Sequence, residues 1–330
     1  MKISTLTLAG VGVLAASLAW AQNAPPEPLR SGLAAQAHFR AAEKIAGEEY
    51  ATAARRLCTP ITGAPAGFAD PHRIPPTKVF DNLWYIGTDY VGTWAVKTSA
   101  GIILIDSMNN PEDARNIIIP GLRQAGLDPA QLKYVLLSHG HFDHYGGAAT
   151  LRTTTPDLRV GSSEADWALM AASPRGGTMT VGDVSIPMPA PPEKDYVVAD
   201  GQKLTLGDTT LTLLLTPGHS PGTVSFIVPV TDNGVKHTVA IWGGNAAPGT
   251  VAAQKQMLAS LGHFRASAKA AHVDAEAALH PPYDNGPARL AKVAARKPGE
   301  PNPYVIGEAG FERFTEWMSE CIQGRIASWP

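Results

Sequence analysis

The apolar positions of the chain fall into short runs separated by glycine, asparagine and threonine, the pattern of β-strands joined by turns. The runs predict strands at Val79–Gly87, Gly92–Lys97, Gly101–Asp106, Leu132–Leu137, Leu158–Val160, Lys203–Leu206, Thr210–Leu215, Val224–Val228 and Val239–Trp242. Before them, residues 34–56 are rich in alanine, glutamate and arginine and contain no proline, so they predict one or two helices.

Further helices are predicted between and after the strands. One begins at Asn110, which caps its first turn and is followed by Pro111. The others cover Ser163–Met170, Ala252–Ala271, Gly286–Ala295 and Ala309–Ile326. Residues 59–76 predict a proline-rich connector and residues 174–194 a long loop.

The order of these elements bears on the fold class. Two successive blocks of strands followed by helices predict one α/β (α+β) domain of four layers, with two sheets face to face and helices outside. A doubly wound parallel sheet is the competing architecture, but the glycine-rich phosphate fingerprint that it often carries is missing.

The beginning of the chain has the features of a secretory signal. Lys2 precedes an apolar run over Ile3–Trp20, and Ala19-Trp20-Ala21 offers a small-x-small cleavage site. Cleavage after Ala21 would give a periplasmic or secreted protein. The alternative is an uncleaved membrane anchor, because the run is near the lower length limit of a span. This divides the chain into a signal peptide (1–21), an N-terminal helical extension with its connector (22–76) and the main domain (77–330).

Composition narrows the range of functions. Hydrophobic residues make up 44% of the 330 residues, which argues against a disordered chain or a polytopic membrane protein. The net charge is −2 and no basic block occurs, so a nucleic-acid partner is not expected. After signal cleavage no stable membrane partner is expected either.

The chain has two cysteines, Cys58 and Cys321, too few for a disulfide scaffold or a cysteine-built zinc module. In an oxidising compartment the two can pair, which would tie the N-terminal extension to the last helix; the alternative is two buried thiols. Neither cysteine has a Cys-x-x-Cys partner, so a redox role is not expected.

One segment concentrates side chains that bind metals. It places His139, His141, Asp143 and His144 within six residues, directly after the predicted strand Leu132–Leu137. A surface loop with incidental histidines is the alternative, but the end of a buried strand is where rigid loops usually carry function.

The spacing within this segment suits two cations. His139 and His141 are two residues apart and can bind one ion, whereas Asp143 and His144 are adjacent and suit a second ion nearby. Imidazoles with a single carboxylate favour zinc, in an open site that leaves positions for water.

Further ligands must come from distant parts of the chain. His219 and His280 each follow an apolar run and precede a proline-containing turn, the same placement as the first cluster. The remaining histidines are expected to be ordinary surface or core residues: His38, His72, His237 (placed in a hairpin turn), His263 and His272.

Taken together, the pattern His-x-His-x-Asp-His, then Thr-Pro-Gly-His, then Leu-His-Pro resembles the metallo-β-lactamase fold superfamily. The resemblance runs from about Val79 to the C-terminus and is strongest to the subclass B3 metallo-β-lactamases. It implies an αββα sandwich with the metals at one edge of the sheets, and two zinc ions per chain.

The resemblance also implies a role for each ligand. His139, His141 and His219 would bind the first zinc ion, and Asp143, His144 and His280 the second. Asp106, at the end of a predicted strand, matches an acidic position that orients a metal-binding histidine.

The segment after the strand Val239–Trp242 bears on subclass and substrate. Many hydrolases of the superfamily place a bridging aspartate there, and subclass B1 places a cysteine in the same region; this chain has neither, which leaves the B3 ligand set. Asn245 stands near the place where B3 enzymes commonly carry hydroxyls that seat the substrate carboxylate. This departure weakens the case for efficient β-lactam turnover, while metal-dependent hydrolysis is unaffected.

The function implied is a secreted dinuclear zinc hydrolase that opens a β-lactam ring by attack of a zinc-bound hydroxide, which Asp143 also orients. A small molecule would be its substrate, with Asn245, Tyr145 and Trp94 as candidate substrate-contacting residues. The alternatives are a zinc hydrolase of the same fold that acts on lactones or other esters, and a periplasmic metal-binding protein without catalysis.

Overall fold

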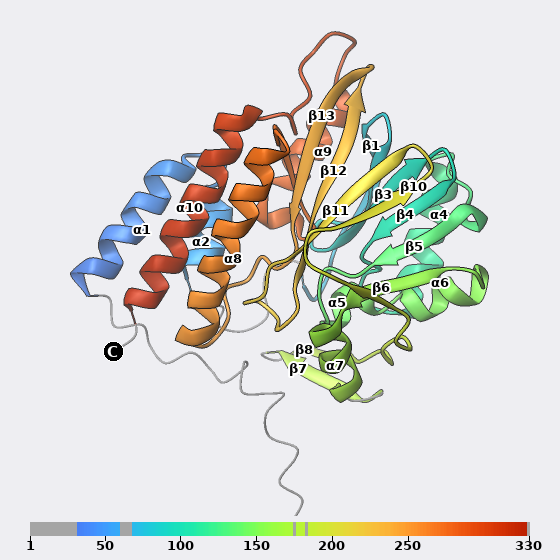
Figure 1. Cartoon of the computed structure of the whole chain (residues 1–330), viewed down its shortest axis with the longest axis horizontal. Coiled ribbons are helices and arrows are strands. Elements are labelled where there is room, and N and C mark those ends of the chain that lie inside the picture. The colour runs from blue at the N-terminus through green and yellow to red at the C-terminus, as the bar shows by residue number, and fades with distance from the viewer. Residues whose placement is uncertain (1–31, 60–67, 174–175, 182–183, 329–330) are drawn as a thin grey trace, which may run out of the picture.

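The computed structural model describes residues 32–59, 68–173, 176–181 and 184–328 (Figure 1). The predicted signal peptide and the middle of the predicted connector lie outside these ranges. Two sheets stack face to face, and helices cover both outer faces, as Figure 1 shows from left to right. The predicted four-layer αββα sandwich is confirmed.

The larger sheet has the strand order β1-β2-β3-β4-β5-β6-β9. Its strands are β1 (Arg73–Phe80), β2 (Leu83–Thr88), β3 (Gly92–Thr98), β4 (Gly101–Ile105), β5 (Leu132–Leu136), β6 (Arg159–Ser163) and β9 (Tyr196–Val198). β1 to β4 form an antiparallel meander, and β4, β5, β6 and β9 run parallel. The carboxyl ends of β4, β5 and β6 therefore lie at the same edge of the sheet.

The smaller sheet has five strands in chain order. They are β10 (Gln202–Leu206), β11 (Thr209–Leu215), β12 (Val224–Asp232), β13 (Val235–Trp242) and β14 (Ala275–Ala278). β10 to β13 are antiparallel, and β14 joins parallel to β13 after a helical crossover. β11, β13 and β14 consequently end on one side of the sandwich.

The inner core lies between the two sheets, where alternate residues of most strands are buried. Trp94 and Ile103 of the larger sheet belong to one buried cluster with Leu213, Phe226 and Ile241 of the smaller sheet. Burial of these apolar side chains is the main force that fixes the relative position of the sheets.

One set of helices covers the outer face of the larger sheet. They are α3 (Pro111–Asp113), the π-helical turn Ala114–Ile118, α4 (Ile119–Gln124), α5 (Phe142–Tyr145), α6 (Ala148–Thr154) and α7 (Glu164–Ala172). Ile118, Leu122 and Leu151 from these helices share a buried cluster with Ile86 and Leu104 of the sheet. The Asn110 side chain caps α3 as predicted, by accepting from the amide of Asp113.

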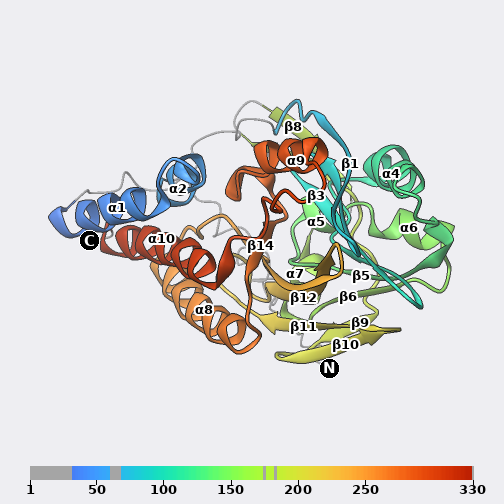
Figure 2. The same cartoon turned by 90° about the horizontal axis from the view of Figure 1, so that it is seen from above.

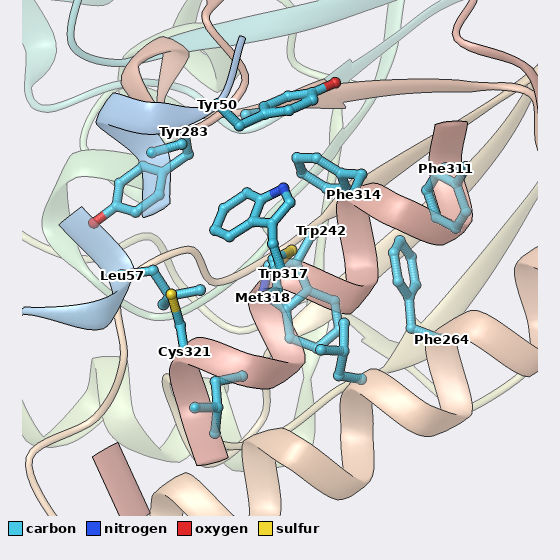
Figure 3. Packing of buried hydrophobic residues seen from close by; sticks show 14 of the residues in the cluster. Tyr50, Leu57, Trp242, Phe264, Tyr283, Phe311, Phe314, Trp317, Met318 and Cys321 are labelled. Atoms are coloured by element: carbon cyan, nitrogen blue, oxygen red, sulfur yellow. The ribbon is translucent and has the colours of Figure 1, made fainter. Parts of the chain in front are cut away.

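The smaller sheet is covered by α1 (Leu33–Ala46), α2 (Ala51–Cys58), α8 (Val251–Ala270) and α10 (Gly307–Ala327), while α9 (Gly286–Ala295) packs near β1. Figure 2 shows α1 lying alongside α10. Aromatic side chains fill the space between these helices, with Tyr50 against Phe314 and Trp317 (Figure 3). The N-terminal extension is thus part of the outer helical layer.

A disulfide bond joins Cys58 at the end of α2 to Cys321 in α10, with a Cα–Cα distance of 4.5 Å. The predicted bridge between the extension and the last helix is confirmed. None of the described helices is both long and apolar enough to span a membrane.

Several details differ from the expectations, among them strands β9 and β14, which are not among the predicted strands. The first predicted strand is two strands, and β1 begins at Arg73 inside the predicted connector; Pro75 and Pro76 are tolerated because β1 is an edge strand. The predicted loop 174–194 contains the hairpin β7 (Thr178–Val181) and β8 (Val184–Pro187). His237 lies within strand β13 rather than in a turn.

We expect the disulfide to contribute measurably to stability, because it closes a loop between residues 263 positions apart. Replacing both Cys58 and Cys321 with serine should lower the free energy of unfolding by about 2–5 kcal/mol. Urea unfolding with and without a reductant measures this. Reductant should destabilise the native protein and leave the double variant unchanged; a native protein that is insensitive to reductant would contradict the expectation.

Candidate metal centre

The predicted metal ligands meet at one edge of the sandwich, because each follows the end of a strand. His139 and His141 follow β5, and Asp143 and His144 lie on the short helix α5 directly after them. His219 follows β11 of the opposite sheet. His280 follows β14.

His139, His141 and His219 form a first triad. The Nε2 atoms of His139 and His219 are 3.1 Å apart. The His141 ring centroid lies 4.7 Å from that of His139 and 4.8 Å from that of His219. One nitrogen of each residue lies within 4.8 Å of the other two, close enough for a single ion.

Asp143, His144 and His280 form a second triad. Oδ2 of Asp143 is 3.6 Å from Nε2 of His144 and 3.5 Å from Nε2 of His280, and the two nitrogens are 3.1 Å apart. Ligand atoms around a tetrahedral zinc ion, with bonds of ~2.0–2.1 Å, lie about 3.3 Å apart. The second triad therefore has the spacing of a coordination face.

The two triads adjoin each other. The rings of His139 and His144 have centroids 3.9 Å apart, and His139 also groups with Asp143 and His144 within 4.8 Å. The arrangement can thus accept two ions side by side.

Backbone carbonyls hold the outer nitrogen of three histidines. Nδ1 of His139 is 2.9 Å from the oxygen of Gly243, and Nδ1 of His219 is 2.7 Å from the oxygen of Ala246. Nδ1 of His280 is 2.9 Å from the oxygen of Tyr90. A carbonyl can only accept, so each Nδ1 must donate, and each Nε2 keeps its lone pair for a metal.

Glycines make the contact with His219 possible. A Cβ atom on Gly244 would lie 2.4 Å from the Cβ of His219, and a Cβ on Gly243 would lie 1.9 Å from the oxygen of Val224. Only a backbone without side chains can pass this close to the ligand.

Asp106 supports the second triad through a hydrogen bond to His144. Its Oδ2 accepts from Nδ1 of His144 at 2.5 Å and from the Ser138 hydroxyl at 2.8 Å, while its Oδ1 accepts from the Ser138 amide at 2.6 Å. The residue is fully buried and has a φ of 66°, a conformation that costs energy for an aspartate. The structure thus places Asp106 where the sequence predicts it, orienting His144.

Burial and mutual proximity keep most of the histidines neutral. Burial lowers the pKa of His139 and of His141, and neighbouring imidazoles lower that of His139 further. The pKa of His219 falls to about 3 and that of His280 to about 4, in both cases chiefly through burial. Neutral imidazole is the form that binds metal.

His144 and Asp143 shift each other's pKa in opposite directions. Burial by itself lowers the pKa of His144, but the carboxylates of Asp143 and Asp106 outweigh it and raise the pKa above its usual value. Burial raises the pKa of Asp143, and His144 and His280 reverse this, so that it lies below its usual value. Asp143 is therefore an anion at neutral pH.

The three predicted substrate-contacting residues have different environments. Asn245 lies in the segment Gly243–Ala246 that contacts the first triad, and its Oδ1 is buried with no hydrogen-bond partner among the described residues. The prediction that Trp94 contacts the substrate is wrong. Trp94 lies between the sheets and donates its indole N–H to the oxygen of Ala278. Tyr145 is also buried, in the cluster that packs the outer face of the larger sheet. Both aromatic residues are core.

Sequence reasoning missed two side chains that support the site. Ser138 links Asp106 to His139, its hydroxyl lying 3.0 Å from His139 Nδ1. Asp166, at the start of α7, is fully buried against both ligand loops, and burial raises its pKa to about 6 although hydrogen bonds from Ser220 and Gly140 lower it. Neither residue stands out in the sequence, since serine and aspartate near strand ends and in first helical turns are common.

The depressed pKa values predict acid sensitivity of the metal-free protein. His219 and His280 resist protonation when folded but bind protons below about pH 6.5 when unfolded, so stability must fall as pH falls. From about pH 7.5 to about pH 5 each should cost on the order of 2 kcal/mol, with His144 opposing the trend.

Urea unfolding of the metal-free protein at both pH values measures this dependence. A variant that carries both His219→Gln and His280→Gln should lose about half of it, because the lowered pKa values of His139 and His141 remain. His263→Gln, which replaces an exposed histidine, should not change it. An unchanged pH dependence in the double variant would contradict the prediction.

Comparison with known proteins agrees with this geometry. Residues 86–232 match the family model of the metallo-β-lactamase superfamily. The "Probable metallo-hydrolase YqgX" of Bacillus subtilis is 35% identical over 124 residues, which are 37% of this chain and 55% of that protein. The "N-acyl homoserine lactonase AttM" of Agrobacterium fabrum is 29% identical over 160 residues, covering 45% of this chain and 58% of that protein. The chain thus spans little more than half the length of these curated relatives.

Solved structures match over a larger share of the chain. BJP-1, a subclass B3 metallo-β-lactamase of Bradyrhizobium japonicum, is 28% identical with a TM-score of 0.61, covering 75% of this chain and 90% of that one. A metallo-β-lactamase of Cronobacter sakazakii is 29% identical with a TM-score of 0.60, covering 74% and 91%. The comparisons support the predicted class, a metal-dependent hydrolase. Residues 86–232 thus match the metallo-β-lactamase superfamily, and the chain shares the fold of these solved metallo-β-lactamase structures.

Proposed function

We propose that the protein is a dinuclear zinc hydrolase that opens the ring of a β-lactam. The observation that carries the proposal is the pair of adjoining triads, His139-His141-His219 and Asp143-His144-His280, whose ligand atoms face one another at the edge of the sandwich. The similarity to subclass B3 structures over about three quarters of the chain supports the substrate class.

The donor set suits zinc. Five imidazoles and one carboxylate are borderline to hard donors, and a nitrogen-rich set of three ligands per ion leaves room for water and substrate. Cysteine, which would favour a closed structural site, is absent because both cysteines form the disulfide. An all-oxygen set, which calcium or magnesium would require, is not present in either triad.

The residues divide the work as follows. The first triad would hold one ion and the second triad the other; when bound, the two ions supply an acidified water and polarise the substrate carbonyl. Asp143 is anionic at neutral pH, so its carboxylate can accept a hydrogen bond from the attacking water and orient it. Asp106 and the Gly243, Ala246 and Tyr90 carbonyls keep the imidazoles in place throughout.

A lactone or another ester is the second candidate substrate. The similarity to N-acyl homoserine lactonases favours it, and so does Asn245, which stands near the place of the hydroxyls that seat a substrate carboxylate in B3 enzymes. The chemistry at the metals is the same for a ring amide and a ring ester, so the substrate-binding residues decide between them.

We also propose that the protein acts in the periplasm or outside the cell. The disulfide bond supports this, because such bonds persist in oxidising compartments and are rare in the cytosol. The signal-like segment at residues 1–21 is the sequence feature that agrees with it.

A substrate panel tests the proposal. The zinc-loaded protein is assayed against a penicillin, a carbapenem and an N-acyl homoserine lactone, with and without a chelator. We expect ring opening of the β-lactams that the chelator abolishes and added zinc restores. Turnover of the lactone alone would favour the second candidate, and two bound zinc ions with no turnover of any substrate would contradict a hydrolase.

Two histidine variants provide the matched comparison. His139→Ala removes a ligand of the first triad and should lower kcat/KM by more than about 100-fold, beyond the effect of losing a residue that only supports a ligand. His263→Ala removes an exposed histidine paired with Asp200 and should leave the rate unchanged. Full activity in the His139→Ala variant would contradict the assignment of the site.

A further inference from the structure

Asp166 lies between the two loops that carry the first triad. It belongs to the first turn of α7, which begins directly after β6 of the larger sheet. The hydroxyl of Ser163 caps this turn by accepting from the Asp166 amide at 3.2 Å. The side chain is 0% exposed, although most aspartates lie at the protein surface.

Each oxygen of the Asp166 carboxylate binds one or both ligand loops. Oδ2 accepts from the Gly140 amide at 2.9 Å and from the Ser220 hydroxyl at 2.6 Å. Oδ1 accepts from the Gly222 amide at 2.9 Å. Gly140 separates His139 from His141, and Ser220 directly follows His219, so one carboxylate connects all three ligands of the first triad.

The loops also approach α7 more closely than side chains would allow. A Cβ atom on Gly222 would lie 1.9 Å from the Ser163 hydroxyl and 2.8 Å from the Asp166 amide. A Cβ on Gly140 would lie 3.0 Å from the Asp166 carbonyl oxygen. The two loops are therefore held against the same helical turn, one from each sheet.

The second triad is supported by different groups. His144 is held by Asp106, and His280 by the carbonyl of Tyr90. The hydroxyl and amide of Ser107 both donate to the carbonyl of His144, which fixes α5 independently of α7. A change at Asp166 should therefore affect the two triads unequally.

We propose that Asp166 is a positioning residue that sets the separation of His139 and His141 from His219, and thereby the affinity of the first triad for its metal ion. The inference rests on the metal-dependent function proposed above, but it concerns metal binding and not the substrate. Hydrogen bonds to charged acceptors are the strong ones, and three of them join here on one rigid carboxylate.

The test measures zinc affinity at one triad at a time, by competition with a chromophoric chelator. In a His280→Ala background only the first triad is complete, and in a His219→Ala background only the second. Asp166→Asn keeps the shape of the side chain but replaces one acceptor oxygen with a donor. In the first background it should weaken zinc binding by about 10- to 100-fold, and in the second by no more than about twofold.

Asp195→Asn is the matched control. Asp195 is also a supporting carboxylate, which accepts from Arg152, Arg159 and the amide of Val160, but it contacts neither ligand loop. It should leave the zinc affinity of both backgrounds unchanged, even where it lowers stability. An equal loss at the first triad in the Asp195 variant would mean that general destabilisation explains the effect, and would overturn the proposal.

A milder variant covers the case in which Asp166→Asn does not fold. Ser220→Ala removes one of the three hydrogen bonds and should weaken first-triad binding severalfold. Unchanged first-triad affinity in Asp166→Asn, or in Ser220→Ala where it alone folds, would overturn the role of Asp166. Failure of the parent chain to bind two equivalents of zinc would instead contradict the proposed function, so the two failures are distinguishable.

Discussion

The site depends on one constraint: the outer nitrogen of each supported histidine is bound to an acceptor that cannot move. The acceptors are the carbonyls of Gly243, Ala246 and Tyr90 and the carboxylate of Asp106. They lie at the ends of strands from both sheets, so the packing between the sheets determines where the imidazoles point. With each Nδ1 fixed in this way, the Nε2 nitrogens face a common centre. In this sense the metal centre is a property of the whole sandwich.

This constraint explains what could be read from the sequence. The cluster from His139 to His144 is recognisable because four ligand-type residues share one short segment, and His219 and His280 share its placement after apolar runs. The acceptors of their hydrogen bonds are mostly backbone carbonyls, which any residue provides, so they leave no signal. Asp166 is equally hidden, because an aspartate in a first helical turn usually caps the helix or faces water.

The fold shows the same division. The layers follow from the alternation of strands and helices, and the disulfide from two cysteines in an otherwise cysteine-free chain. The predictions for single residues and strand bounds are wrong where tertiary contacts override the local sequence preference. β1 keeps two prolines because it lies at the edge, and His237 extends β13 beyond the predicted start because it pairs with Val230 and binds Asp274. Trp94 is an aromatic residue of the core, and because both faces of β3 are buried, its residue type alone does not separate a core position from a site position.

The N-terminal helices reach further into the domain than an appended segment would. The turn between α1 and α2 contributes Tyr50 and Glu49, which accept hydrogen bonds from the buried Arg289 of α9. The same guanidinium binds Glu276 of β14, the strand that ends just before His280. A buried charge with several partners is expensive to disrupt, since removing one partner leaves the others uncompensated. The extension and the ligand-bearing strand are therefore energetically linked.

The pair Gly243–Gly244 also bears on how this site can change in evolution. A side chain on Gly243 would collide with Val224, and one on Gly244 would collide with His219. A single substitution at either glycine therefore cannot add a metal ligand without moving the backbone. A path from this ligand set to one with a carboxylate on either glycine therefore requires the backbone of this segment to shift first.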